Sequence, residues 1–392
     1  MEGQMTFEFN QRPTIKGFPE LRWTGKRPYR STQYYPAQLR ERYGEEKDNW
    51  INKIFWGDNL QVMSHMLKEY RGKIKLIYID PPFATGGVFA VDADGRVATI
   101  SKSADSEVAY EDTLKGKDFI DFLRARVALI YELLSDNGSL YLHIDYKIGH
   151  YVKVMLDEVF GAESFRNDIT RIKCNPKNFA RIGYGNIKDM ILFYSKSASP
   201  IWNAPKEKCN ESDIAKLYNK IDANGRRYTT VPIHAPGETQ NGETNKPFRG
   251  ILPPKGRHWR CSIEELERLD AAGLIEWSSK GNPRKINYAD DHLDKKIQDI
   301  WEYKDPIRPL YPTEKNLKML ELIVKASSSP DSIVMDCFCG SGTTLVASML
   351  HSRRWIGIDK SEVAIETTKK RIAALSLFEN EKEYEFLTLT NK

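Results

Sequence analysis

The sequence predicts an α/β protein built on a doubly wound, mostly parallel sheet that carries an inserted lobe. Two stretches alternate short buried strands with amphipathic helices, and a basic stretch rich in turn residues separates them. Such alternation is typical of parallel sheets, because each helical crossover returns the chain to the same edge. The 392 residues suffice for one large core with an insertion of this kind.

The domain bounds follow from this pattern. Residues 1–50 are polar and aromatic without a sustained period, which predicts an irregular amino-terminal arm. We expect the first half of the sheet over residues 51–198 and the inserted lobe over residues 199–305. The second half of the sheet is expected over residues 306–392.

The first half opens with a strand at residues 53–56, a turn, and a helix whose apolar residues recur at helical spacing. A buried strand at residues 74–79 then ends at Asp80, where two prolines follow. Small and polar residues dominate 84–112 and predict a loop. The remaining elements of this half are expected as helices at 117–134 and 150–160 and strands at 139–145 and 190–195.

The lobe contains many turn signals around a single helix at residues 263–272. The stretch that follows returns to strict alternation, which predicts that it completes the same sheet. Its expected elements are helices at 315–326, 343–350 and 361–375 and strands at 332–336 and 355–359.

Composition excludes several classes of protein. No apolar run approaches the length needed to span a bilayer, and the amino terminus lacks a secretory signal pattern, so a cytoplasmic protein without a membrane partner is expected. Cys337 and Cys339 lie close together but lack a second ligand pair, so no metal is expected. Residues 171–310 hold 25 Lys and Arg against 18 Asp and Glu. This excess fits a lobe that contacts phosphates, although a solvated surface would give the same excess.

A candidate cofactor site lies in the second half, where a strand, a glycine turn and a helix start follow one another. Gly340 and Gly342 allow the backbone to approach a ligand closely, and the helix amino terminus favours a carboxylate. Asp359 ends the next strand, 23 residues after Asp336, where an acidic side chain accepts hydrogen bonds from ribose hydroxyls. The missing GxxxxGK[ST] pattern disfavours a nucleoside triphosphate, and the missing third glycine disfavours NAD. An adenosine-containing ligand of another kind remains, and the alternative is a turn that binds nothing. The candidate residues are Asp336, Phe338, Cys339, Gly340, Ser341, Gly342, Thr343, Thr344 and Asp359.

A candidate catalytic tetrad, Asp80-Pro81-Pro82-Phe83, follows the buried strand at the edge where open α/β sheets bind their ligands. Neither proline has an N–H, so the Pro81 carbonyl and the Asp80 carboxylate can both accept from one amino group. Accepting both protons moves the nitrogen of an aromatic amine toward the tetrahedral geometry of a nucleophile. Phe83 offers a ring face for stacking on a base. The alternative is a proline-terminated strand with a capping Asp.

In this order the two motifs resemble those of the β class of DNA amino-methyltransferases, which act on adenine N6 or cytosine N4, especially the modification (Mod) subunits of type III restriction systems. In that class a DPPY/F tetrad precedes the target-recognition domain and an FxGxGTT loop follows it, as here. Four further segments look like family landmarks: 56–60 (the GDN segment), 136–145, 256–260 with 300–301, and 311–315, which is similar to the HPTQKP box.

The resemblance implies a Rossmann-like methyltransferase sheet with circularly permuted motif order, S-adenosylmethionine as cofactor, and a target-recognition lobe. It also assigns Asp58, Thr313 and Lys315 to cofactor binding, the last two at the methionine end. Four positions depart from the family pattern without removing a needed acceptor: Phe83 for Tyr, Cys337 for Pro, Tyr311 for His and Asn316 for Pro.

The implied activity is methylation of adenine N6 in a flipped base of double-stranded DNA. DPP favours adenine in the family and SPP favours N4 of cytosine, but the chemistry suits both. An RNA methyltransferase and a DNA-binding module without catalysis also stay open, and an insert of roughly a hundred residues favours duplex DNA.

The candidate DNA contacts are Arg249, Arg257, Trp259 and Arg260, with buried core as the alternative for Trp259. Related enzymes often dimerise, so a homodimer stays open. The stretch after residue 376 is too short for a nuclease domain, so any restriction subunit is expected as a separate chain. The recognition sequence and the number of methylated strands stay open.

Overall fold

The computed structural model divides the chain into two units, which we call the sheet unit (residues 1–204 and 298–392) and the lobe (residues 205–297). The residues that the structure describes are 5–9, 17–82, 88–91, 97–99, 107–111, 114, 116–176, 180, 182–237, 242–279, 281–291, 294–307, 309, 311, 314–379 and 383–389. The lobe is shorter than the expected 199–305. The reason is that the Asn203 amide donates to the Ala326 carbonyl and Ile300–Trp301 pairs with a strand of the main sheet.

The sheet unit is organised around one ten-stranded sheet. Its strands are β3 (Gln38–Tyr43), β4 (Asn52–Trp56), β5 (Ile74–Ile79), β9 (Leu134–Ile144), β10 (Phe165–Ile172), β11 (Lys188–Ser195), β20 (Ile300–Trp301), β21 (Ile333–Asp336), β22 (Arg354–Asp359) and β23 (Tyr384–Thr388). They lie in the order β20-β10-β11-β9-β5-β21-β22-β4-β23-β3. The strands from β9 to β23 in this order are parallel, whereas β11 and β3 run against their neighbours. The predicted doubly wound, mostly parallel sheet is confirmed.

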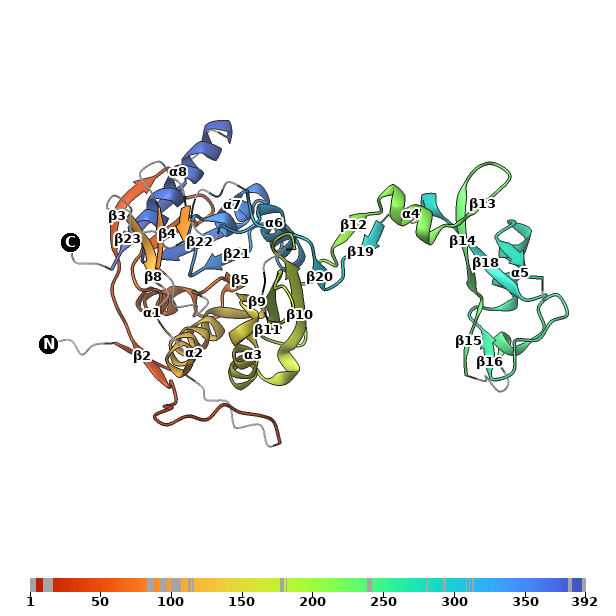
Figure 1. Ribbon diagram of the computed structural model, residues 1–392, viewed down its shortest axis with the longest axis horizontal. Helices are drawn as coiled ribbons and strands as arrows, with labels where there is room; N and C mark the ends of the chain where they lie inside the picture. The colour runs from red at the N-terminus through yellow and green to blue at the C-terminus, as the bar shows by residue number, and fades with distance from the viewer. Residues whose placement is uncertain are drawn as a thin grey trace. The chain divides into compact units, whose positions relative to one another are not determined.

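Helices cover both faces of this sheet (Figure 1). On one side lie α1 (Asn59–Tyr70), α2 (Gly116–Leu133) and α3 (Tyr146–Phe160), and on the other lie α6 (Leu317–Ser327), α7 (Thr343–Leu350) and α8 (Glu362–Glu379). Alternate residues of the buried strands face the two layers, because successive side chains of a strand point to opposite faces. Phe55 of β4 packs with the α1–α3 layer, and its neighbour Ile54 packs with α7 and α8.

The two motifs lie at the same edge of the sheet, as predicted. β5 and β21 are hydrogen-bonded parallel neighbours, with Asp336 opposite Tyr78. β22 lies next to β21 and pairs with β4, with Asp359 opposite Trp56. The residues that follow the carboxyl ends of these four strands, Asp80 among them, therefore share one edge.

Several strands were not predicted. The amino-terminal arm is partly regular, since it contains β1 (Thr6–Glu8), β2 (Ser31–Gln33) and β3, and β3 joins the main sheet through β23. The expected loop at 84–112 lies largely outside the described residues, but β6 (Val88–Val91), β7 (Val97–Thr99) and β8 (Glu107–Glu111) form a small antiparallel sheet within it. These strands depend on pairing with distant partners, which local sequence patterns do not reveal.

The lobe has a core of its own. Four strands, in the order β13-β14-β18-β17, form its largest sheet: β13 (Lys220–Ile221), β14 (Arg227–Pro232), β18 (Pro283–Tyr288) and β17 (Ile275–Trp277). Its remaining elements are β12 (Lys206–Lys208), α4 (Glu211–Leu217), β15 (His234–Pro236), β16 (Arg257–Trp259), α5 (Ile263–Ala271) and β19 (Asp294–Lys296). Phe248, Trp259 and Leu266 are buried together beside Ile233 and Leu269. In neither unit does a described helix have the length and apolar character needed to cross a bilayer.

Candidate active site

Asp80 directly follows β5, and its two carboxylate oxygens have different surroundings. Oδ2 lies 2.6 Å from Nζ of Lys315, in an ion pair whose side chains are largely withdrawn from solvent. Oδ1 is buried and has no hydrogen-bond partner among the described residues. A buried carboxylate oxygen without a donor is costly unless a ligand supplies one, so Oδ1 marks an acceptor available to a ligand. Pro81 and Pro82 follow Asp80 as predicted, and Phe83 lies outside the described residues.

The glycine turn after β21 has the backbone shape that the sequence predicts. Gly340 has φ +51° and Gly342 has φ +75°, both in the left-handed region that favours glycine. A Cβ at Gly342 would lie 2.8 Å from Cγ2 of Thr368, so only glycine fits there without a shift. Thr368 also donates its hydroxyl to the Gly340 carbonyl at 2.9 Å, which fixes the turn against α8.

The hydroxyls of the glycine turn are used within the protein. Thr344 donates to Oδ2 of Asp336 at 2.6 Å. Arg371 of α8 donates to the hydroxyls of Ser341 and Thr343 at 2.9 and 3.0 Å, and lies 3.0 Å from Oε1 of Glu314. Cys339 is buried beneath the turn, and Phe338 is partly buried near Phe122. The turn is therefore braced before any ligand binds, and a direct role of these side chains in cofactor binding stays a prediction.

The acidic side chains at this edge accept backbone hydrogen bonds. Asp359 accepts from the Gly340 and Ser361 amides, each at 2.9 Å, and each of its oxygens retains a further lone pair for a ribose hydroxyl. Burial raises the pKa of the Asp359 carboxyl despite these bonds. Burial likewise raises the pKa of Asp336 from 3.8 to about 7, against the bonds from Thr344 and Phe338 that lower it.

The raised pKa of Asp336 predicts a pH-dependent stability. Between 3.8 and about 7 the folded state binds more protons than the unfolded state, so this group's contribution to the free energy of unfolding falls as pH rises. The loss is complete above about pH 7 and its slope is at most about 1.4 kcal/mol per pH unit. Urea unfolding from about pH 4 to about pH 8 should show a flatter pH dependence for Asp336→Asn than for the wild type.

Asp168→Asn, which removes an exposed carboxylate on β10, is the matched control. Parallel pH profiles for the wild type and Asp336→Asn would contradict the prediction.

Asp58 is committed to the structure of the sheet unit. Its Oδ1 caps α1 by accepting from the Leu60 amide at 2.9 Å, and its Oδ2 lies 2.8 Å from Arg126. Arg126 also donates to Asn59, whose amide donates to the Cys337 carbonyl at 2.8 Å. Asp58 thus links the start of α1 to the glycine turn, and the cofactor contact predicted for it stays a prediction.

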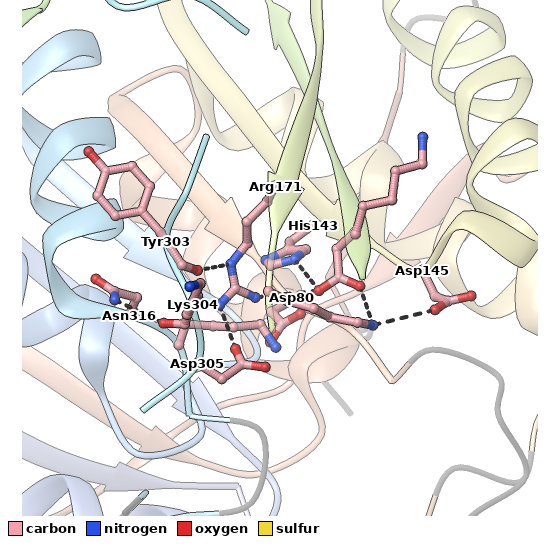
Figure 2. Close-up of polar contacts among 12 residues, drawn as sticks. Asp80, His143, Asp145, Arg171, Tyr303, Lys304, Asp305 and Asn316 are labelled. Atoms are coloured by element: carbon pink, nitrogen blue, oxygen red, sulfur yellow. Dashed lines mark hydrogen bonds and ion pairs between the residues drawn. The ribbon is translucent and has the colours of Figure 1, made fainter. Parts of the chain in front are cut away.

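A buried polar network lies beside Asp80 (Figure 2). The Tyr78 hydroxyl lies 2.9 Å from Nδ1 of His143, and Nε2 of His143 lies 3.2 Å from Oδ2 of Asp189. Arg171 and Lys173 also contact the Asp189 carboxylate, at 3.4 and 2.6 Å. Burial lowers the pKa of His143, whereas bonds from His143 and Lys173 outweigh burial and lower the pKa of Asp189.

The structure removes one of the candidate DNA contacts and leaves the others as predictions. Trp259 is 1% exposed and donates its indole N–H to the Lys246 carbonyl, so it belongs to the lobe core, the alternative that the sequence left open. Arg249 is paired with Asp270 at 2.9 Å. Arg257 and Arg260 both contact His234, one at its ring and the other at its carbonyl.

Several residues of the site have no signal in the sequence. Arg126, Arg171, His143 and Arg371 reach their partners across long stretches of chain, as with Arg371 and Ser341, which are 30 residues apart. Of the family box at 311–315, Thr313 lies outside the described residues, whereas Lys315 contacts Asp80. A metal site was not expected, and no group of three or more possible metal ligands occurs within the described ranges.

A doubly wound parallel sheet with a glycine turn and buried acidic groups at its carboxyl edge defines a nucleoside-binding α/β protein. The chain belongs to the N6/N4 DNA methylase family, whose model matches residues 74–370.

It is similar to the type II methyltransferase M.EcaI of Enterobacter cloacae, at 42% identity over 82% of this chain and 69% of the relative. It is also similar to the StyLTI Mod subunit, a type III restriction-modification enzyme of Salmonella typhimurium, at 27% identity over 78% of this chain and 50% of the relative. Thus the chain spans about half the length of that relative. Among solved structures, TTHA0409 of Thermus thermophilus, a DNA modification methylase complexed with S-adenosyl-L-methionine, covers 87% of this chain and 99% of its own, at 15% identity and a TM-score of 0.44.

Proposed function

We propose that the chain transfers a methyl group from S-adenosylmethionine to N6 of adenine in double-stranded DNA, acting on a base flipped out of the helix. The observation that carries this proposal is the buried Oδ1 of Asp80, which lacks a donor among the described residues and lies at the edge shared with the glycine turn. A duplex hides its exocyclic amines within stacked base pairs, so a buried acceptor can reach one only after base flipping.

The residues around the glycine turn fit S-adenosylmethionine. The left-handed Gly340 and Gly342 give a turn that a ligand can approach closely, and the α7 amino terminus suits the carboxylate of the cofactor. Asp359 offers its remaining lone pairs to ribose hydroxyls. The cofactor supplies an electrophilic methyl group on a sulfonium.

Asp80 and Pro81 orient the amine that receives the methyl group. Oδ1 of Asp80 and the Pro81 carbonyl accept its two N–H bonds, which localises the lone pair on nitrogen and points it away from both acceptors. The protein thereby contributes positioning and fixed charges rather than a covalent intermediate. Phe83 stacks on the flipped base in this proposal.

The finer assignments rest on the family resemblance. The DPP tetrad favours adenine over cytosine, for which the family more often carries SPP. Arg257 and Arg260 of the lobe are the proposed phosphate or base contacts, supported by their proximity to one another around His234. StyLTI Mod is named as part of a restriction-modification enzyme, and we propose by analogy a separate restriction subunit and a cytoplasmic location for this chain.

The test is product analysis after incubation with labelled S-adenosylmethionine. We expect label in unmethylated plasmid DNA and not in RNA, and N6-methyladenine after nucleoside digestion. N4-methylcytosine would shift the base assignment while leaving the chemistry intact. No label in any DNA, together with no cofactor binding by calorimetry, would favour a DNA-binding module without catalysis.

A further inference from the structure

Lys315 contacts the catalytic carboxylate rather than standing apart from it. Its Nζ lies 2.6 Å from Oδ2 of Asp80, and the exposed fractions of the two side chains are 9% and 15%. A charge-assisted bond of this length in such surroundings restricts rotation of the carboxylate, whose two oxygens are otherwise equivalent. One oxygen is held by the lysine, and the other, Oδ1, is left without a donor among the described residues.

The backbone on both sides of Lys315 is anchored. Glu314 is held by Arg371, which also holds Ser341 and Thr343 of the glycine turn. Asn316 caps α6 by accepting from the Lys318 amide at 3.0 Å, and it donates to the Lys304 carbonyl at 2.9 Å. Lys315 is therefore placed by its neighbours and does not need Asp80 to find its position.

A second anchor lies earlier in the same segment (Figure 2). Arg171 is completely buried and donates to the Tyr303 carbonyl at 2.7 Å, and it also pairs with Asp305. The Asp305 amide donates to the Lys173 carbonyl at 2.9 Å. The buried network on β10 and β11 thus fixes the strand-like stretch that leads to Lys315.

We propose that Lys315 is a positioning residue for methyl transfer: it holds Oδ2 of Asp80 so that Oδ1 is the oxygen presented to the target amine, and the Arg171 anchor sets where Lys315 lies. This role differs from the cofactor contact that the family resemblance implies for Lys315. It rests on the proposed function, because it assigns a task within that reaction. Fixing one oxygen in advance removes a rotation that the reacting complex would otherwise have to restrict.

The first experiment separates positioning from cofactor binding. The cofactor Kd is measured by calorimetry, and single-turnover transfer of labelled methyl to unmethylated plasmid DNA is measured at saturating cofactor. We expect Lys315→Gln to slow transfer about 10- to 100-fold while the cofactor Kd changes less than about threefold. Lys315→Arg, which keeps the charge and a donor, should recover most of the rate. Lys318→Gln, an exposed lysine nearby on α6, is the matched control.

The second experiment tests the anchor. Asp305→Asn should slow transfer in the same direction by a smaller factor, also with an unchanged cofactor Kd, whereas Glu302→Gln in the same segment should not. These carboxylates are exposed enough for the variants to fold, which thermal unfolding checks.

The outcomes separate this inference from the proposed function. A Lys315→Gln enzyme with weakened cofactor binding and a normal rate at saturating cofactor would make Lys315 a cofactor ligand and overturn the inference. So would a rate equal to the wild type. If the wild type and Lys318→Gln both fail to methylate DNA, the proposed function itself fails.

Discussion

Replacing Asp80 with alanine is expected to reduce methyl transfer by about 100- to 1,000-fold or more, while cofactor binding persists. The substitution removes the buried Oδ1 that accepts from the target amine in our proposal. It leaves the cofactor side of the site, the glycine turn and Asp359, with its own hydrogen bonds intact. The measurements are single-turnover transfer of labelled methyl to plasmid DNA and the cofactor Kd by calorimetry.

The same substitution deprives Lys315 of its partner, so stability must be measured alongside activity. An uncompensated, largely buried cation costs up to several kcal/mol. Asp80→Asn keeps the shape and one acceptor oxygen and should fold more readily. Asp168→Ala, which removes an exposed carboxylate from β10, is the control. Transfer at the wild-type rate by a folded Asp80→Ala enzyme would reject the assigned catalyst.

Gly342→Ala should weaken cofactor binding about tenfold for each 1.4 kcal/mol of strain that binding must overcome. The alanine would have to adopt φ +75°, and its Cβ would lie 2.8 Å from Cγ2 and 2.9 Å from Oγ1 of Thr368. The backbone penalty alone is about 1 kcal/mol, and the contact with a buried threonine adds to it. Calorimetric titration with S-adenosylmethionine and thermal unfolding measure the two effects.

A matched control separates strain from collision. Gly72 has φ +71° in the turn after α1, and a Cβ added there would meet nothing within 4 Å, so Gly72→Ala should incur only the backbone penalty and leave cofactor affinity unchanged. Adding Thr368→Ala to Gly342→Ala removes the collision and should restore part of the lost affinity. Equal effects of Gly72→Ala and Gly342→Ala on cofactor affinity would show that the turn tolerates a side chain.

Much of the architecture could be predicted because it follows from local periodicity. The strands β4, β5, β21 and β22 and helices α1, α2 and α7 lie within a few residues of their predicted bounds. Buried parallel strands and amphipathic helices each repeat with their own period, so these elements can be recognised without knowing their partners. The polar strands β3 and β10 could not be recognised in this way, since their partners β23 and β11 supply the pairing.

The sequence by itself determined the order of the motifs, the residue types at the carboxyl ends of the strands, and the need for glycine where the turn enters left-handed φ. These are properties of short segments, governed by backbone sterics and by periodicity. Only the tertiary structure decided which groups meet: Lys315 with Asp80, Arg126 with Asp58, and Arg371 with the glycine turn. The physical reason is that ion pairs and hydrogen bonds between distant segments depend on how the sheet brings those segments together, and neither spacing nor composition encodes that distance.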